Sequence, residues 1–388
     1  MPDRAIAQRV EFFVDANGSF YPSGWCSYLA KPKVCAAIPI KPPKRLAGDS
    51  LYNNADARWA RDGATFRALI DADQSRQLAA LAEFVRGKHR VFILVHGFNN
   101  HVDTITPPFR AIEDRLDLQP EDTVIRFYWD GLTAKGLGAL KIWFPAAGYS
   151  QLAGSRGLRK VLEQLDDKEI YLISHSRGAS VILSALGNPV YARQFWDKTK
   201  LVAGGWKPPV DDLLNPAPLS ATKSRYHLMF LAPAVGRIDF CDTSEQPRLN
   251  DRVEDTPELK RARAKTGGVD DAARAWAGCV ALRSFGAHLK DIRYTINISD
   301  PALRKGVGFQ YRFNPTTLGV EPEVGRALAQ EGGYPMTAYF TDPPRAEHTF
   351  LEYVRDPSFY RMLCDAGILH PSLRTPARSC APPPVDTP

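Results

Sequence analysis

The chain has 388 residues, of which 44% are hydrophobic, 24% charged and 10% aromatic. These proportions are close to the globular average, so they exclude a disordered, collagenous or coiled-coil chain and leave enough apolar material for a sizeable core. The formal net charge is +7, and the basic residues are scattered without a long run of like charges. We therefore expect no nucleic-acid partner. We expect the excess of positive charge to lie on a solvated protein surface. Peripheral contact of that surface with anionic lipids is the alternative.

The sequence predicts no integral membrane segment, because no stretch approaches the roughly 18 consecutive apolar residues of a transmembrane helix. The opening residues, MPDRAIAQRV, lack the apolar region of a secretory signal peptide. The chain as it stands is therefore expected in the cytoplasm, although a periplasmic or secreted protein whose export signal had been removed would look the same. The 6 cysteines have no spacing suited to zinc. Cys26 and Cys35 are close enough in sequence to form a disulfide in an oxidising compartment.

Residues 1–85 are expected to form an extension to the main unit. The segment VEFFVDANGSFYP at 10–22 predicts two short strands around an Asn-Gly turn, the strongest short-range hairpin signal. A proline-rich segment follows at 31–48, and a helix with apolar residues at helical spacing is predicted at 72–89. We expect this extension to cover an edge of the main sheet rather than to contact a partner.

From residue 86 onward, continuous apolar runs alternate with helical patterns. Strands are predicted at 90–97, 122–131, 169–176, 226–234, 292–299 and 336–341. Helices are predicted at 103–118, 154–167, 177–187, 275–289 and 347–356. This alternation indicates βαβ units and a mostly parallel central sheet, and the continuously apolar strands indicate that helices cover both faces. We expect one α/β catalytic domain at 86–365 and a loose C-terminal tail at 366–388.

Two stretches are interpreted as insertions on this core. Residues 239–272 are rich in charge, which is typical of a solvated helix rather than a binding surface. Residues 132–150 are apolar and contain glycines. Within the second stretch, Trp143 and Phe144 are candidates to line a substrate pocket, with simple core packing as the alternative.

The segment IYLISHSRGASVIL carries the strongest chemical signal. A buried strand runs into Ser174-His175-Ser176-Arg177-Gly178 and a helix begins at once, which is the pattern of a nucleophile elbow. Such a tight turn needs small residues two positions before and after the nucleophile. Gly178 meets that need, and Ser174 replaces the usual glycine. The turn would raise the Ser176 hydroxyl above the sheet, at the positive end of the following helix.

A second signal is the strand VFILVHGFNN, which ends in His96-Gly97 two βα units before the elbow. An oxyanion needs about two preorganised N–H donors near 3 Å, and we predict the backbone N–H groups of Phe98 and Arg177 for this role. His96 is then expected to hold the loop by side-chain hydrogen bonds. It is not the predicted general base, because it precedes the serine in the chain.

The predicted base is His348. In enzymes with this kind of elbow, an acid and then a histidine follow the serine, and the histidine comes after the last strand. His348 lies a few residues beyond the strand predicted at 336–341. His370 is expected at the surface of the tail, and His175 is expected to pack on neighbouring strands.

The predicted acid is Asp300, which follows the strand at 292–299 and precedes a proline. A carboxylate in that place can orient the imidazole of the base and stabilise its charged form. Asp239, after the strand at 226–234, is the alternative acid. The simple interpretation of Asp300 as the start of an Asp-Pro turn is compatible with the catalytic one.

These features resemble the α/β-hydrolase superfamily, and the chain is most similar to a bacterial branch of uncharacterised hydrolases with an HGFN oxyanion loop. The shared features are His96–Asn99, the FYWDG segment around Trp129, the elbow Ser174–Gly178 and the late segment Ser299–Leu303. The resemblance covers residues 88–360. It implies the α/β-hydrolase fold, a Ser176–Asp300–His348 triad and hydrolysis of an ester-like bond, and it names no substrate.

We therefore expect a serine hydrolase that cleaves a small-molecule or lipid carboxylic ester through an acyl-enzyme, without a metal or organic cofactor. A small to medium acyl esterase is favoured. Lipase or phospholipase activity is an alternative, because Trp143, Phe144 and the positive charge would suit a membrane interface. Acyl transfer, amide hydrolysis and a non-catalytic binding module on the same scaffold are further alternatives. The oligomeric state is not readable from the sequence.

Overall fold

The computed structural model describes residues 8–15, 17–24, 62–100, 102–131, 146, 148–187, 219, 222–240, 288–305, 310, 315–374 and 380. Within them, seven strands form one sheet in the order β1-β3-β2-β4-β5-β6-β7. Every neighbouring pair is parallel. The strands are β1 (Gln8–Val14), β2 (Arg90–Val95), β3 (Thr123–Trp129), β4 (Glu169–His175), β5 (Arg225–Leu231), β6 (Leu289–Ile296) and β7 (Met336–Phe340).

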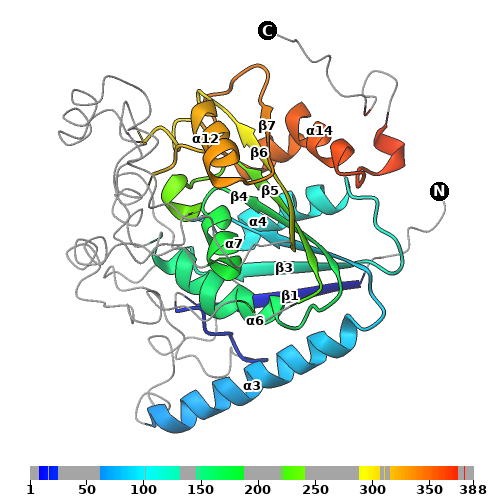
Figure 1. Ribbon diagram of the computed structural model, residues 1–388. Coiled ribbons are helices and arrows are strands. Elements are labelled where there is room, and N and C mark those ends of the chain that lie inside the picture. The colour runs from blue at the N-terminus through cyan, green and yellow to red at the C-terminus, as the bar shows by residue number, and fades with distance from the viewer. Residues whose placement is uncertain are drawn as a thin grey trace.

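Helices cover both faces of this sheet, which confirms the predicted α/β architecture (Figure 1). Side chains of a strand point alternately to its two faces, and β2 shows this directly. Val91, Ile93 and Val95 belong to one apolar cluster, together with residues of α3 (Gly63–Phe84), α6 (Arg159–Leu162), α7 (Gly178–Leu186) and α12 (Pro322–Gly332). Phe92 and Leu94 belong to the other, with residues of α4 (Val102–Glu113), α13 (Phe350–Arg355) and α14 (Pro357–Asp365).

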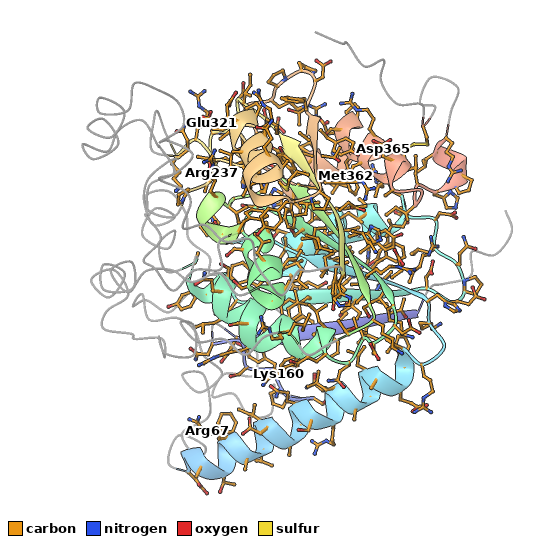
Figure 2. The ribbon with its side chains drawn as sticks, viewed as in Figure 1. Arg67, Lys160, Arg237, Glu321, Met362 and Asp365 are labelled. Carbon is orange, nitrogen blue, oxygen red and sulfur yellow. A yellow bond between two sulfur atoms is a disulfide. The ribbon has the colours of Figure 1, made fainter. Side chains whose placement is uncertain are left out.

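Figure 1 shows α3 along the β1 side of the sheet and α14 beside β7. In Figure 2 the labelled residues Met362 and Asp365 mark α14, while Arg67 marks the distant end of α3. Short turns complete the described structure: a π-helical turn (Ala153–Leu158) leads into α6, and 3-10 turns cover Arg237–Phe240 and Pro371–Leu373. Because all the strands are parallel, the loops after β4, β6 and β7 leave the same edge of the sheet. That edge is where ligands bind in open α/β sheets.

The N-terminal segment differs from a separate hairpin. β1 pairs in parallel with β3 over its whole length and forms one edge of the central sheet. The Asn-Gly turn is present, since Gly18 has a φ of +76°, but the return strand is reduced to a single bridge between Val14 and Phe20. Phe12 and Val14 are buried in the core of the main unit. Joining the sheet buries far more apolar surface than an isolated two-stranded hairpin can, because such a hairpin is marginally stable at best.

The helix α12 was not predicted from the sequence, although its ends carry recognisable signals. Pro322 stands in the first turn, where its missing N–H costs nothing. Gly333 adopts the left-handed conformation that commonly ends a helix. Near the other end of the chain, Cys364 and Cys380 form a disulfide that ties α14 to the C-terminal region.

Several sequence predictions fall outside the described residues. They are the disulfide between Cys26 and Cys35, the proline-rich segment 31–48, the pocket candidates Trp143 and Phe144, and most of the stretches 132–145, 239–272 and 275–289. The boundaries at residues 85 and 365 stay predictions.

The amino ends of β4, β5 and β6 carry a charged cluster centred on His227. Its Nδ1 lies 2.6 Å from Asp291 Oδ2, and its Nε2 contacts Glu169. Burial by itself would lower the pKa of His227, but the hydrogen bonds and negative charges of Asp291 and Glu169 outweigh it and raise that pKa above its ordinary value of 6.5. Because carboxylates only accept hydrogen bonds, both ring nitrogens donate in this geometry, which is that of an imidazolium between two carboxylates.

Replacing His227 by glutamine should lower the free energy of unfolding by about 2 kcal/mol at pH 6. A raised folded-state pKa gives stability that is fully present below 6.5 and is lost as the pH rises through the folded-state value. The difference between wild type and variant should therefore shrink between pH 6 and pH 9 in urea unfolding curves. The exposed His89 provides the control, since His89→Gln should change stability little at either pH. If His227→Gln lowered the free energy of unfolding equally at both pH values, the raised pKa of His227 would be contradicted.

Candidate active site

Ser176 lies at a strained turn between β4 and α7. Its φ is +53°, in the left-handed region that residues other than glycine rarely adopt. The turn is fastened to the next strand, because the Ser176 amide donates to Leu231 O at 2.9 Å and the Ser176 carbonyl accepts from Ala234 N at 3.1 Å. The strand, the turn and the helix start follow each other as the sequence predicts for a nucleophile elbow.

Gly178 is needed at the elbow because its backbone closely approaches the end of β2 and the start of the loop that follows it. A β-carbon there would lie 2.7 Å from His96 O and 2.8 Å from Val95 O, closer than real β-carbons come to backbone atoms. It would also lie 3.1 Å from Ser174 Cβ. The serine at 174 is therefore accommodated because residue 178 has no side chain.

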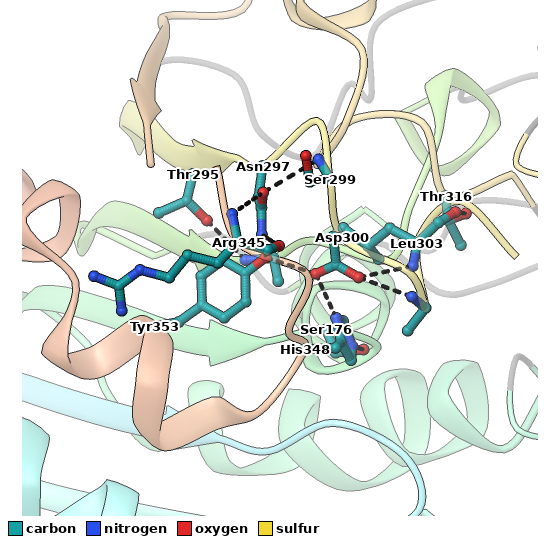
Figure 3. A network of polar contacts seen from close by, with 12 residues as sticks. Ser176, Thr295, Asn297, Ser299, Asp300, Leu303, Thr316, Arg345, His348 and Tyr353 are labelled. Atoms are coloured by element: carbon teal, nitrogen blue, oxygen red, sulfur yellow. Dashed lines mark hydrogen bonds and ion pairs between the residues drawn. The ribbon is translucent and has the colours of Figure 1, made fainter. Parts of the chain in front are cut away.

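The structure brings Ser176, His348 and Asp300 together at the carboxyl edge of the sheet (Figure 3). His348 Nδ1 is 2.7 Å from Asp300 Oδ2, and His348 Nε2 is 2.8 Å from Ser176 Oγ. A carboxylate only accepts hydrogen bonds, so the ring proton lies on Nδ1, and Nε2 accepts from the serine hydroxyl. The His348 side chain is 18% exposed, whereas Asp300 is fully buried. Solvent therefore reaches this group of three from the histidine side.

Asp300 is held by four hydrogen-bond donors. Oδ1 accepts from the backbone N–H groups of Ala302 and Leu303, both at 3.0 Å. Oδ2 accepts from His348 and also from the hydroxyl of Tyr353, at 2.6 Å. A buried carboxylate is costly unless its oxygens are satisfied in this way. The turn that begins at Asp300 thus fixes the carboxylate, and the turn and acid interpretations are indeed compatible.

His96 holds the loop after β2 and is neutral. Its Nδ1 donates to Gly97 O at 2.7 Å, and its Nε2 accepts from the Trp129 amide at 3.1 Å. The indole N–H of Trp129 returns a hydrogen bond to His96 O at 2.7 Å. Complete burial lowers the pKa of His96 to about 4, against the opposing effect of these hydrogen bonds. Nδ1 is thus engaged within the loop and Nε2 with the end of β3, which is typical of a structural rather than a catalytic histidine.

The same loop lies against the elbow. A β-carbon on Gly97 would be 2.9 Å from Ser176 Cβ, and one on Gly131 would be 3.0 Å from Phe98 Cα. The backbone of Gly97 and Phe98 is therefore packed between the nucleophile and the end of β3. Arg177 contributes the first backbone amide after Ser176, at the entry to α7. These two amides, of Phe98 and Arg177, are the ones predicted to form the oxyanion hole, and their role stays a prediction.

The remaining candidates are not part of the hydrogen-bonded chain from Ser176 to Asp300. His175 was expected to pack on neighbouring strands, and its ring contacts lie on α13 and on the loop before that helix. It stacks on Phe350 with ring centroids 4.6 Å apart, and its ring is 4.9 Å from that of His348. Burial first, and then the nearby His348, lower the pKa of His175 well below its ordinary value, so it is neutral.

Asp239 is buried and accepts from the Gly236 amide at 2.9 Å. His370 pairs with Ser372 in the turn after α14.

Sequence reasoning missed Tyr353 and Asn297. Tyr353 lies on α13 and donates to Asp300, while the Asn297 amide donates to the Tyr353 hydroxyl at 3.0 Å. Asn297 also binds the backbone of Arg345, accepting from its N–H at 3.2 Å and donating to its carbonyl at 2.8 Å. It therefore connects the end of β6 with the loop that carries His348. No spacing rule signals such a pair, because it depends on two loops that meet only in the folded chain.

The parallel seven-stranded sheet, with helices on both faces and the elbow at the carboxyl ends of its strands, is that of the α/β-hydrolase fold. Residues 73–203, about a third of the chain, match a family model described as "Alpha/beta hydrolase of unknown function (DUF900)". The match covers β2, β3, β4 and the elbow, and it supports a hydrolase domain of the α/β-hydrolase superfamily. No curated protein and no solved structure matches the chain.

The described residues hold neither a cluster of metal-ligating side chains nor a helix fit to span a membrane. They contain no group of three or more His, Cys, Asp and Glu side chains placed to hold a metal ion. They also contain no helix whose length and apolar character would let it cross a bilayer.

Proposed function

We propose that this protein is a serine hydrolase that cleaves carboxylic esters through an acyl-enzyme intermediate. The observation that carries the proposal is the unbroken chain of hydrogen bonds from Ser176 Oγ to His348 and from His348 to Asp300. A nucleophile bonded to a base, with that base oriented by a third group, is recognised by its geometry and not by sequence position.

In the proposed first step, Ser176 Oγ attacks the ester carbonyl carbon while its proton passes to His348 Nε2. The resulting imidazolium lies against the Asp300 carboxylate, which stabilises the charge and keeps the ring in one orientation. The tetrahedral intermediate then expels the alcohol, which takes the proton from His348 Nε2. The products are free alcohol and an ester of Ser176.

The negative oxygen of the tetrahedral intermediate needs donors that are already in place. The backbone N–H groups of Phe98 and Arg177 are proposed for this role, because the Gly97–Phe98 backbone packs on Ser176 and Arg177 opens α7. The positive end of α7 adds a favourable field for the same charge.

In the second step, a water molecule replaces the alcohol. It gives a proton to His348 Nε2 and attacks the acyl carbon, and collapse of the new intermediate returns that proton to Ser176 Oγ as the carboxylic acid leaves. The partial exposure of His348 supports solvent access to this nitrogen.

Labelling with a fluorophosphonate probe, followed by peptide mapping, tests the proposal. The probe reacts with an activated serine, losing fluoride and leaving one phosphonyl group on the oxygen. We expect a single adduct on Ser176 in the wild type and none in Ser176→Ala. Ser184, a buried serine further along α7, supplies the matched control, and Ser184→Ala should be labelled like the wild type. A folded wild-type protein without the adduct would favour a non-catalytic binding module.

A panel of esters with graded acyl length, assayed with and without an alcohol acceptor, separates the finer possibilities. Fastest turnover on short to medium acyl groups in water is the result expected here. Preference for long chains presented on vesicles would indicate a lipase or phospholipase. A new ester formed in the presence of the acceptor would indicate acyl transfer by the same residues.

A further inference from the structure

Asp300 Oδ2 is shared by two donors, and only one of them belongs to the proposed triad. His348 Nδ1 is 2.7 Å away and the Tyr353 hydroxyl is 2.6 Å away (Figure 3). Tyr353 is 4% exposed and stands on α13, in the first turns after His348. The phenol therefore contacts the same carboxylate oxygen that would orient the base.

Asn297 directs the proton of this phenol toward Asp300. The Asn297 amide donates to the Tyr353 oxygen at 3.0 Å, and the same amide nitrogen donates to Arg345 O at 2.8 Å. The phenol oxygen accepts from Asn297, and the carboxylate can only accept, so the hydroxyl hydrogen points at Asp300. Burial, and next the negative charge of Asp300, raise the pKa of Tyr353 far above its ordinary value of 10.0. The phenol therefore remains a donor over the whole working range of pH.

We propose that Tyr353 is a positioning residue of this site, which fixes Asp300 Oδ2 and spreads its charge so that Asp300 orients His348 in the proposed hydrolysis. The inference rests on the proposed function, but the hydrogen bonds behind it can be tested without any turnover. Tyr353 acts through Asp300 and touches no reacting atom.

The charged surroundings of His348 determine what loss of the phenol would do. Asp300 faces it from the loop after β6, and the neutral His175 ring lies beside it at the end of β4. Arg345, in the loop of His348, has its guanidinium 3.8 Å from Glu352 and 3.6 Å from Asp356. Among these described groups, only Tyr353 shares Oδ2 with the imidazole. Removing its hydroxyl returns negative charge to the oxygen that faces His348 and favours the imidazolium.

The first test is the pH dependence of fluorophosphonate labelling in Tyr353→Phe. Labelling needs a neutral His348, so we expect the acidic limb of the profile to move up by about half to one pH unit. The matched control is Tyr339→Phe, since Tyr339 is buried on β7 and donates to Asp365 at 2.7 Å, away from the site. That variant should keep the wild-type profile. If the labelling rate of Tyr353→Phe fell by the same factor at every pH, Tyr353 would have a merely structural role and the inference would be overturned.

The second test follows the proton between His348 and Asp300 by low-field proton NMR. Its resonance is assigned by its loss in Asp300→Asn. Because two donors share Oδ2, removing one strengthens the other bond, and the resonance should move further downfield in Tyr353→Phe but not in Tyr339→Phe. An unchanged resonance in a protein whose Ser176 is labelled by the probe would overturn the inference about Tyr353 and leave the proposed function standing. A shifted resonance in a protein that the probe does not label would support the shared hydrogen bond of Tyr353 and contradict the proposed hydrolase function.

A double variant provides the check on the route of action. If Tyr353 acts only through Asp300, adding Tyr353→Phe to Asp300→Asn should change the residual labelling rate by less than about twofold, because coupled residues are not additive. A further large loss would show that Tyr353 acts by another path and would count against the proposal. Thermal unfolding of each variant identifies any that fails to fold.

Discussion

Asparagine in place of Asp300 should lower the turnover number for an activated ester by about 10⁴-fold. The asparagine side chain would present an N–H₂ group where Oδ2 now accepts from His348 and Tyr353. The imidazole would then be held with its proton on Nε2, so that it could no longer accept the proton of Ser176. The measurement is steady-state hydrolysis of a chromogenic short-chain ester, compared with the unfolding temperature of the same sample.

Asp239→Asn provides the matched control for this prediction. Asp239 is also a buried carboxylate after a strand of the sheet, and it accepts a hydrogen bond from the Gly236 amide. Its replacement should leave turnover within about threefold of the wild type, as for a residue outside a coupled catalytic unit. Equal losses in the two variants, or a larger loss at Asp239, would remove Asp300 from the proposed role.

Alanine in place of Gly178 should lower the free energy of unfolding by about 2 kcal/mol and the turnover number by about 100-fold. The added methyl would lie within 2.8 Å of the carbonyl oxygens of Val95 and His96. These atoms belong to the β2 backbone and the loop that follows it, so the elbow must shift instead. A shift of the order of 1 Å would separate Ser176 from both the imidazole and the loop amides. Urea unfolding and ester hydrolysis measure the two effects.

Gly63→Ala is the control for added bulk. Gly63 begins α3, and a β-carbon there would meet nothing within 4 Å. This variant should keep the stability and activity of the wild type, or gain slightly in stability, because alanine favours the helix. Wild-type activity in a folded Gly178→Ala protein would show that the elbow tolerates displacement and would contradict the assignment.

Features that depend on neighbours in the chain can be predicted from the order of the residues alone. Continuous apolar runs alternating with helical patterns were enough to predict the parallel sheet and its two helical layers, because burial on both faces requires such strands. The pattern around Ser176 predicted the turn, since a strand, a sharp bend and a helix start each have local signals. The order of later strands then singled out Asp300 and His348, which the fold brings to the same edge.

The side chains that surround those three residues are known from the folded chain and not from the sequence. Tyr353 meets Asp300 because α13 places it beside the loop that follows β6, and Asn297 joins that loop to the backbone of Arg345. His175 stacks on Phe350 for the same reason. β1 likewise enters the sheet beside β3, which lies more than 100 residues further along the chain. Such contacts depend on how distant segments share apolar surface and satisfy buried polar groups, and no local spacing in the sequence records that choice.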